Sequence, residues 1–282
     1  MPIELKNVTY KYESRTKNAL EDVSVTFSSE DFTAIIGPTG SGKSTLIQHL
    51  DGLLHATSGD VLFDGESIYD KGYDKKKLRS NVGIVFQYPE YQLFESTVFD
   101  DVAFGPKCLG LDENEIKERV EKSLELVGMT PEQYERSPFE LSGGQRRRAA
   151  IAGVLAMSPK YLVLDEPAAG LDPQGRRDIL GLMRALHDEH GIGIILVSHS
   201  MEDVAEYADR VIVLHDGHIE MDGSPKEVFA DSEHLFALGL DIPQVSALMK
   251  KLKERGLIVD EGIISEDEAV SEILKALYYT GR

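Results

Sequence analysis

The residues best suited to chemistry in this sequence form a glycine-rich loop that ends in a lysine and hydroxyl side chains. Residues 37–44 read GPTGSGKS, after the apolar run 33–36 and before a helical pattern at 44–54. Glycines let the backbone curl so that successive N–H groups point at phosphate oxygens, and the following helix adds the positive end of its dipole. Lys43 can place a charge between the β- and γ-phosphates, and the Ser44 hydroxyl suits Mg²⁺. The nucleotide contacts predicted here are Gly37, Pro38, Thr39, Gly40, Ser41, Gly42, Lys43, Ser44 and Thr45.

Two carboxylates come directly after another apolar strand, at 161–164. Asp165 ends this strand, where its side chain can hold the shell of a magnesium ion. Glu166 points the other way and can accept a proton from an attacking water. An Asp-Glu pair alone is often only the end of a strand. Together with the glycine loop, it favours phosphate chemistry.

Two further polar residues follow buried strands. His199 follows 194–198, and Gln87 follows 82–86. Parallel strands end on a common edge of a sheet, where ligands bind, so we expect His199 to contact the γ-phosphate rather than serve a structural role. Gln87 could reach both the metal and the water, or be an ordinary loop residue. The predicted Mg²⁺ set, partly acting through water, is Ser44, Gln87 and Asp165.

A second anion-binding pattern lies about a hundred residues after the first, at 141–145. Ser142 can cap a helix, and the two glycines behind it leave bare N–H groups aimed outward. In isolation this would be a plain helix start, but its position just before the Asp165 strand favours a phosphate contact. One chain that binds one nucleotide does not need two phosphate-binding segments. We therefore expect each chain to complete its partner's site through Ser142, Gly143, Gly144 and Gln145.

Composition limits the class of protein. The 282 residues are 41% hydrophobic, enough for one large core plus an appendage. The formal charge of −19 argues against a nucleic-acid or anionic-lipid surface as the main partner. The single cysteine, Cys108, excludes an internal disulfide, fits a reducing compartment and is expected to be buried. No apolar run approaches ~18 residues, and no signal peptide precedes the first strand pattern, so we expect a cytoplasmic chain without a spanning segment.

The pattern along the chain predicts an α/β fold. Continuous apolar strands, including 161–165 and 193–198, alternate with helices, which indicates a mostly parallel core sheet covered on both faces. An alternating strand through Val8, Tyr10 and Tyr12 and a hairpin at Asp64-Gly65 predict an antiparallel β subdomain.

Helices dominate the rest of the pattern. A helical subdomain is expected at about 87–157, within a domain spanning 1–224. Two amphipathic helices, around Val245–Leu252 and after a capping box at 265–268, form the extension 225–282. This extension is too short for a core of its own, so we expect it to pack on a partner subunit rather than on its own domain.

At this point the chain resembles an ATP-binding subunit of an ABC transporter over residues 3–224. The loop 37–44 corresponds to the Walker A motif, Gln87 to the Q-loop and 141–145 to the signature. Asp165 and Glu166 correspond to Walker B and the general base. Asp172 resembles the D-loop residue, and His199 the switch histidine. The resemblance implies a P-loop NTPase of ABC ATPase type that hydrolyses ATP with Mg²⁺, and it places an adenine-stacking aromatic at Tyr12, with Tyr10 as the open alternative.

Three segments are most similar to the ATPases of energy-coupling factor (ECF) transporters, which deliver vitamins and metal ions. These are 87–94, 142–153 and 238–243. The resemblance implies a second, homologous ATPase, a transmembrane scaffold subunit contacted between Tyr88 and Phe94, and a membrane subunit that captures the substrate. It places the chain peripherally on the cytoplasmic face of the membrane, and the runs 146–148 and 165–170 favour the second ATPase of the pair. The motifs are intact, so we expect hydrolysis.

Several alternatives stay open at this stage. A cobalt or nickel ECF system and an ordinary ABC importer share most of these motifs. A non-transport ABC protein of translation or DNA repair is disfavoured by the single cassette and the negative charge. Residues 88–94 either pack in a core or form a groove for a scaffold helix. The sequence identifies neither the transported substrate nor a homodimer or heterodimer.

Overall fold

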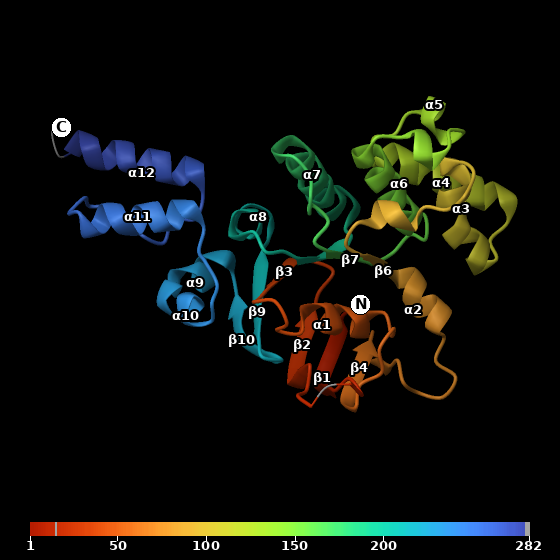
Figure 1. The fold of residues 1–282 in the computed structure, drawn as a ribbon, viewed down its shortest axis with the longest axis horizontal. Helices are drawn as coiled ribbons and strands as arrows, with labels where there is room; N and C mark the ends of the chain where they lie inside the picture. Colours follow the sequence, from red (N-terminus) through yellow and green to blue (C-terminus); the bar gives the residue numbers. More distant parts are fainter. Residues whose placement is uncertain (15, 280–282) are drawn as a thin grey trace.

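The computed structural model describes residues 1–14 and 16–279, which fold around two sheets (Figure 1). A six-stranded sheet has the order β10-β9-β3-β8-β7-β6, and a four-stranded sheet has the order β2-β1-β4-β5. The strands of the larger sheet are β3 Phe32–Ile36, β6 Val82–Val85, β7 Tyr161–Asp165, β8 Gly193–Val197, β9 Arg210–His215 and β10 His218–Gly223. Those of the smaller are β1 Ile3–Tyr10, β2 Leu20–Phe27, β4 Ser58–Phe63 and β5 Glu66–Ser67.

The larger sheet is parallel except at its β10 edge. All residues of β3 and β8 are buried, as continuous apolar strands covered on both faces should be. Asp165 at the end of β7 pairs with Val197 at the end of β8. The carboxyl ends of β3, β7 and β8 therefore meet on one edge, which brings the glycine loop, Asp165 and His199 together.

The smaller sheet is antiparallel, and its β4–β5 hairpin turns at Asp64 and Gly65 with φ of 54° and 81°. Strand β1 has an irregular register between Val8 and Tyr10 and ends at Tyr10. The expectation that Tyr10 and Tyr12 lie on one face of a strand is therefore wrong, because Tyr12 lies beyond the last paired residue.

The helices follow the predicted order with a few differences. They are α1 Lys43–Leu50, α2 Lys75–Asn81, α3 Val98–Leu109, α4 Glu113–Leu126, α5 Pro131–Tyr134, α6 Gly143–Leu155, α7 Pro173–His190, α8 Met201–Tyr207, α9 Pro225–Ala230, α10 Ser232–Ala237, α11 Gln244–Glu254 and α12 Glu266–Tyr279, with short 3₁₀ turns η1 Pro89–Gln92 and η2 Pro138–Glu140. Helix α1 stops earlier than expected because Asp51 accepts the N–H of Leu53 and Gly52 turns the chain at φ 70°. Cys108 is exposed, not buried, because α3 packs through other positions, including Val98 and Val102.

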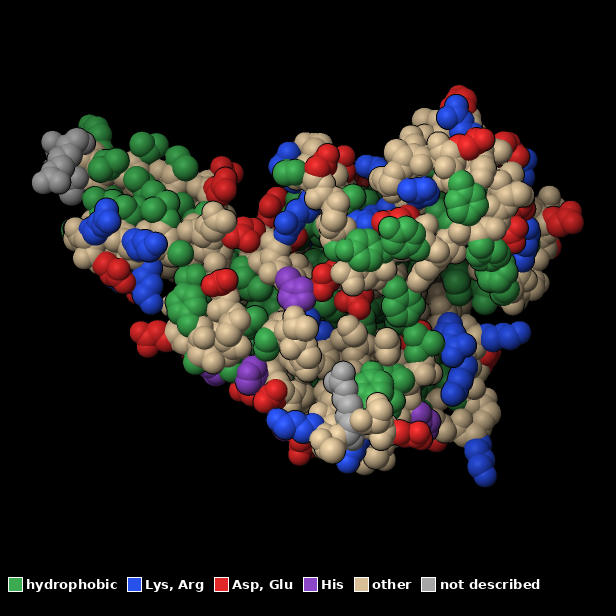
Figure 2. Space-filling model, in the orientation of Figure 1, with side chains coloured by type: hydrophobic (Ala, Val, Ile, Leu, Met, Phe, Trp, Pro, Cys, Tyr) green, Lys and Arg blue, Asp and Glu red, His purple; other side chains and the backbone are tan. Residues whose placement is uncertain are grey.

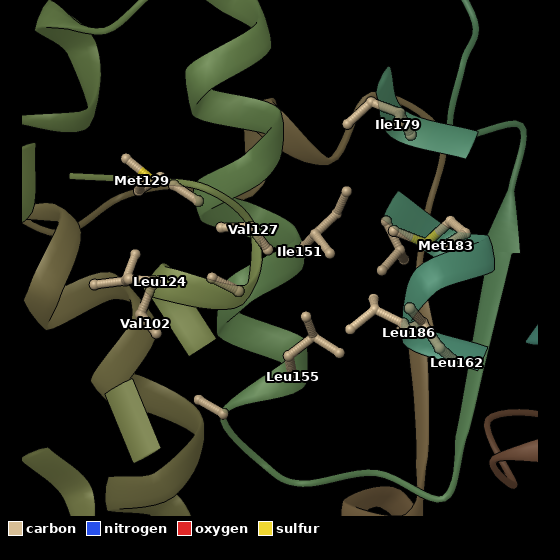
Figure 3. Close-up of a cluster of buried hydrophobic side chains, with 14 of the residues drawn as sticks. Val102, Leu124, Val127, Met129, Ile151, Leu155, Leu162, Ile179, Met183 and Leu186 are labelled. Carbon is tan, nitrogen blue, oxygen red and sulfur yellow. The ribbon is translucent and has the colours of Figure 1, made fainter. Parts of the chain in front are cut away.

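The helical region from α3 to α6 shares its core with the larger sheet. In Figure 3, Ile151 and Leu155 of α6 point toward Leu162 of β7 and Met183 of α7, while Leu124 of α4 lies on the other side of α6, beside Val102 of α3. Each such side chain contributes about 1.5–3 kcal/mol on burial. The helical region is thereby held on the β7 side of the sheet by a continuous apolar cluster.

The C-terminal residues divide into two parts (Figure 1). Helices α9 and α10 bury Val228, Phe229 and Leu235 against β3 and β9, so they belong to the core of the larger sheet. Helices α11 and α12 pack on each other through a second cluster that includes Met249 and Ala276. They form a small hairpin that is attached to the rest of the chain, because Ala247 of α11 packs against the cluster of α9 and α10, and Lys250 Nζ donates to Ser232 Oγ at 3.0 Å. Residues 280–282 of the expected extension lie outside the described residues. Within residues 1–14 and 16–279, we find no helix with the length and apolarity needed to span a bilayer.

Candidate functional site

The loop between β3 and α1 needs its glycines for close backbone packing. A Cβ on Gly37 would lie 2.1 Å from the carbonyl oxygen of Leu214, and one on Gly42 would lie 2.4 Å from that of Ala19. Gly42 has φ of 110° and caps α1 without a side-chain bond, so the first N–H groups of α1 remain available. The Oγ of Ser41 is buried and lacks a hydrogen-bond partner among the described residues. This curled loop fits a phosphate-binding role.

Lys43 and Ser44 place a cation and a hydroxyl at the mouth of the loop. Lys43 Nζ donates to the carbonyl oxygens of Gly37 at 2.7 Å and Pro38 at 3.0 Å. Burial lowers the pKa of Lys43, while Glu166 and Asp165 act in the opposite direction.

The loop also meets the carboxylate that ends β7. Ser44 Oγ donates to Asp165 Oδ2 at 3.2 Å. Burial raises the pKa of Asp165, and the hydrogen bond from Ser44 opposes the shift. A hydroxyl and a carboxylate side by side are oxygen ligands of the kind Mg²⁺ prefers, so this donor set fits the ion.

Three side chains converge beside Asp165. Glu166 has a left-handed backbone, with φ of 51°, and its N–H donates to the carbonyl of Val197. His199 Nε2 lies 2.9 Å from Glu166 Oε1, and Gln87 Nε2 lies 3.4 Å from Glu166 Oε2. Two predicted residues, which follow β8 and β6, therefore flank the carboxylate of Glu166, which follows β7. A water held near this carboxylate could lose a proton to it.

A cavity of about 300 Å³ joins the loop to these strand ends. Its lining consists of Tyr12, Ala19, Thr39, Gly40, Gly42, Lys43, Ser44, Thr45, Asp165, Glu166 and His199. Tyr12 Oη lies 3.1 Å from Thr45 Oγ1. Tyr10 packs edge-on between Tyr12 and His49 and does not line the cavity. Of the two candidate aromatics, Tyr12 is the one that faces the site.

Residues 142–145 lie elsewhere on the surface. Ser142 caps α6 in a capping box, accepting from the N–H of Gln145, whose side chain accepts from the N–H of Ser142. A Cβ on Gly143 or Gly144 would meet no atom within 4 Å. Asp172 caps α7 through its side chain alone, which accepts from the N–H of Gly175. Among the described residues, the lining of the cavity includes none from 142–145 and not Asp172.

Sequence reasoning missed a buried ion pair next to this site. Arg147 of α6 and Glu90 of η1 bond through two nitrogens and two oxygens, at 2.9 and 2.7 Å. Burial, the largest single effect, acts to raise the pKa of Glu90, but the hydrogen bond from Arg147, a backbone hydrogen bond and the charges of Arg147 and Arg146 together hold that pKa below its ordinary value. The two residues lie 57 positions apart, so spacing could not pair them. The available signal was the arginine run 146–148.

The segment after Gln87 is divided between core and surface. Leu93 is buried in the core, whereas Tyr88, Tyr91 and Phe94 are exposed, Tyr91 at 82% and Phe94 at 58%. Phe94 packs edge-on against Phe104, which is also exposed. We refer to Tyr88, Tyr91, Phe94 and Phe104 as the aromatic patch.

The sheet order and the residues gathered at its edge define a P-loop ATPase of the ATP-binding cassette type. A family model described as "ABC transporter" matches residues 20–169. The "Energy-coupling factor transporter ATP-binding protein EcfA2" of Caldanaerobacter subterraneus subsp. tengcongensis is 50% identical over 280 residues, covering 98% of each chain. The protein of the same name from Symbiobacterium thermophilum is 53% identical over 276 residues, covering 97% of this chain and 96% of its own.

Solved structures agree. The cbiO1 protein of Clostridium perfringens, described as part of the ABC transporter complex cbiONQ, is 40% identical with a TM-score of 0.75, covering 88% of this chain and 98% of its own. The cassette MJ0796, described as a dimer bound to ADP and Pi, is 29% identical with a TM-score of 0.70, covering 79% and 98%. This chain belongs to the ABC transporter family, among the energy-coupling factor ATP-binding proteins of the EcfA2 type. It is an ATPase, the ATP-driven motor subunit of such a transporter, and the predictions of fold, family and activity are confirmed.

Proposed function

We propose that this chain binds Mg²⁺ and ATP between its own glycine loop and the Ser142–Gln145 segment of a second, homologous ATPase, and that closure and reopening of this pair drive the transporter. The observation that carries the proposal is the division of the phosphate-binding elements. The loop, Asp165, Glu166 and His199 share one cavity, whereas 142–145 lies outside it with exposed glycines. The dimeric state described for MJ0796 supports pairing of two such chains.

The side chains take distinct roles in this proposal. Tyr12 stacks on adenine, and the loop N–H groups and Lys43 bind the phosphates. Ser44, Asp165 and Gln87 would hold Mg²⁺, partly through water, and the ion would supply positive charge opposite the phosphates.

Hydrolysis falls to the carboxylate at the end of β7. Glu166 accepts the proton of the attacking water at a carboxylate oxygen. His199, whose Nε2 lies 2.9 Å from Glu166 Oε1, keeps that carboxylate in place and reaches the γ-phosphate. Asp172, at the start of α7, faces the partner.

The membrane partner would dock on the aromatic patch. The cbiO1 chain is described as part of a complex, and this supports assembly with other subunits for the related chain here. A transmembrane scaffold helix laid on this patch by its apolar face would bury rings that are now exposed. The chain would then sit peripherally on the cytoplasmic face of the membrane, with a separate subunit capturing a vitamin or another micronutrient.

Replacing both Tyr91 and Phe94 with alanine tests this docking. We expect folding and ATP binding to be kept, while co-purification with the membrane subunits from detergent and substrate uptake are lost. Phe236→Ala removes an exposed ring on α10 and is the matched control. Normal assembly and uptake in the double variant would contradict docking at the aromatic patch.

The α11–α12 hairpin is proposed to contact the partner ATPase. Helix α12 carries two apolar stripes: Ala269, Ile273 and Ala276 pack against α11, while Val270 and Leu274 on the next face are 57% and 62% exposed. Figure 2 shows hydrophobic side chains gathered over this hairpin. Burying two such residues contributes about 1.5–3 kcal/mol each, less the cost of association.

Deleting residues 243–282 tests this contact. The cut spares α9 and α10, which are part of the ATPase core. We expect a folded chain that binds ATP but pairs with its partner ATPase only when ATP is present. Light scattering of the nucleotide-free mixture measures this, and a dimer that persists without ATP would rule out the hairpin as the contact.

A further inference from the structure

The guanidinium of Arg147 lies buried where three functional segments meet. Arg147 is 2% exposed and belongs to α6, the helix that begins at residues 142–145. One side of its guanidinium faces η1, which follows Tyr88 of the aromatic patch and contains Tyr91. The other side faces the loop after Glu166. A buried charge requires full hydrogen bonding, so the hydrogen-bond partners of Arg147 show which segments this side chain connects.

The hydrogen bonds of Arg147 join these segments directly. Nε and Nη2 donate to the two carboxylate oxygens of Glu90 at 2.9 and 2.7 Å. Nη1 donates to the carbonyl oxygens of Pro167 and Ala169, both at 2.9 Å. A planar guanidinium can serve a carboxylate and two carbonyls at once, whereas the single nitrogen of a lysine cannot span them.

Both ends of this bridge attach to short, constrained turns. Glu90 lies in η1 between Tyr88 and Tyr91, two residues of the aromatic patch. At the other end, Pro167 follows Glu166, and the N–H of Ala169 donates to the carbonyl of Glu166. A displacement of η1 would therefore be transmitted through Arg147 to the peptide groups that follow Glu166. These peptide groups set the direction of the Glu166 side chain.

The neighbouring arginines do not share this position. Arg148 donates to the carbonyl of Val127 at 2.6 Å and lies 3.7 Å from Asp178. It is on the same helix but holds the α4–α5 connection and α7. Arg148 is therefore a matched control for the loss of an arginine from α6.

We infer that Arg147 is a positioning residue that links the aromatic patch to Glu166, so that the position of a docked membrane subunit sets the alignment of the carboxylate. The inference rests on the proposed roles of Glu166 and of the aromatic patch. It assigns to Arg147 no contact with nucleotide.

The test compares Arg147→Lys and Arg148→Lys in the complex purified with its partner ATPase and membrane subunits. We expect Arg147→Lys to lower the kcat of ATP hydrolysis about 10–10²-fold, because small misplacements of catalytic groups have effects of this size. KM for ATP should stay within about twofold, since the loop that binds ATP is not touched. Arg148→Lys should lower the melting temperature by a similar amount without the kcat loss. An unchanged kcat in Arg147→Lys, or equal losses in both variants, would overturn the inference.

Glu90→Gln tests the same bridge from its other end. It leaves the two carbonyl bonds of Arg147 in place and removes the charge opposite it. If the residues act through one bridge, the double variant Glu90→Gln with Arg147→Lys should have a kcat no lower than the worse single variant. Multiplying losses would contradict a shared path.

Amide hydrogen exchange separates this inference from the proposed function. We expect the Ala169 amide, which bonds to the carbonyl of Glu166, to exchange faster in Arg147→Lys than in Arg148→Lys. This readout does not depend on turnover. If Glu166→Gln hydrolyses ATP normally, the proposed base is wrong, whereas equal exchange of the Ala169 amide in the two arginine variants would refute the bridge alone.

Discussion

Glu166→Gln is expected to leave ATP binding intact and to lower turnover roughly 10²–10⁴-fold, the range for loss of a general base. The amide has nearly the same shape and can keep the contact with His199, whose Nε2 lies 2.9 Å from the carboxylate. It cannot take a proton from water. Because bound ATP would persist, the variant should also accumulate the closed pair of ATPases.

Phosphate release and binding of a fluorescent ATP analogue measure the two halves of this expectation. Size-exclusion chromatography with ATP detects the closed pair. Lys43→Ala provides the contrast, since it removes the charge facing the phosphates and should weaken binding itself. Hydrolysis by Glu166→Gln at close to the wild-type rate would show that another group accepts the proton.

Ser142→Arg is expected to disable the nucleotide site built on the partner's loop while leaving ATP binding at this chain's own loop measurable. The reason is the position of 142–145, outside the cavity formed by the chain's own loop. A long cation over Gly143 and Gly144 would block the approach of phosphate to their N–H groups. We expect the affected site to lose turnover by about 10²-fold, as when a hydrogen-bond donor to the transition state is removed.

Pairs that carry the substitution on one side only locate the damaged site, because each loop can be followed separately with a labelled nucleotide. Ser224→Arg is the control: Ser224 caps α9 in the same kind of capping box, so it loses the same helix cap. Loss of nucleotide at the mutated chain's own loop would mean that 142–145 acts within its own chain.

The parts of the fold and site that could be predicted depend on short stretches of sequence. The conformation of the loop at Gly37–Ser44 depends on its own glycines, and the buried strands are continuous apolar runs, so both could be predicted from the sequence. Because the strands are parallel, it could also be predicted that their carboxyl ends lie on one edge of the sheet. The predictions failed where tertiary contacts decide the end of an element or the burial of a residue. Examples are Tyr12, which lies beyond the end of β1, and Cys108, which is exposed on α3.

Other features were missed because their signals were short or distant. Helices α9 and α10 have only six residues each, so no periodic pattern could form, although the Ser224–Glu227 capping box was readable. To predict the hairpin of α11 and α12, one would have to know that the weak apolar stripes of the two helices pack against each other. The bond between Glu90 and Arg147 joins two segments that only the folded chain brings together.

The left-handed backbone of Glu166 sets a limit on how this chain can be made more robust. A side chain with a Cβ at φ of 51° costs about 1–2 kcal/mol relative to glycine. Selection or engineering for thermal resistance alone would therefore favour glycine or asparagine at the position that our mechanism gives to the proton acceptor. With glutamate at this position, catalytic activity and the stability of the fold are opposed at a single residue. Stabilising substitutions would therefore have to be sought elsewhere in the chain.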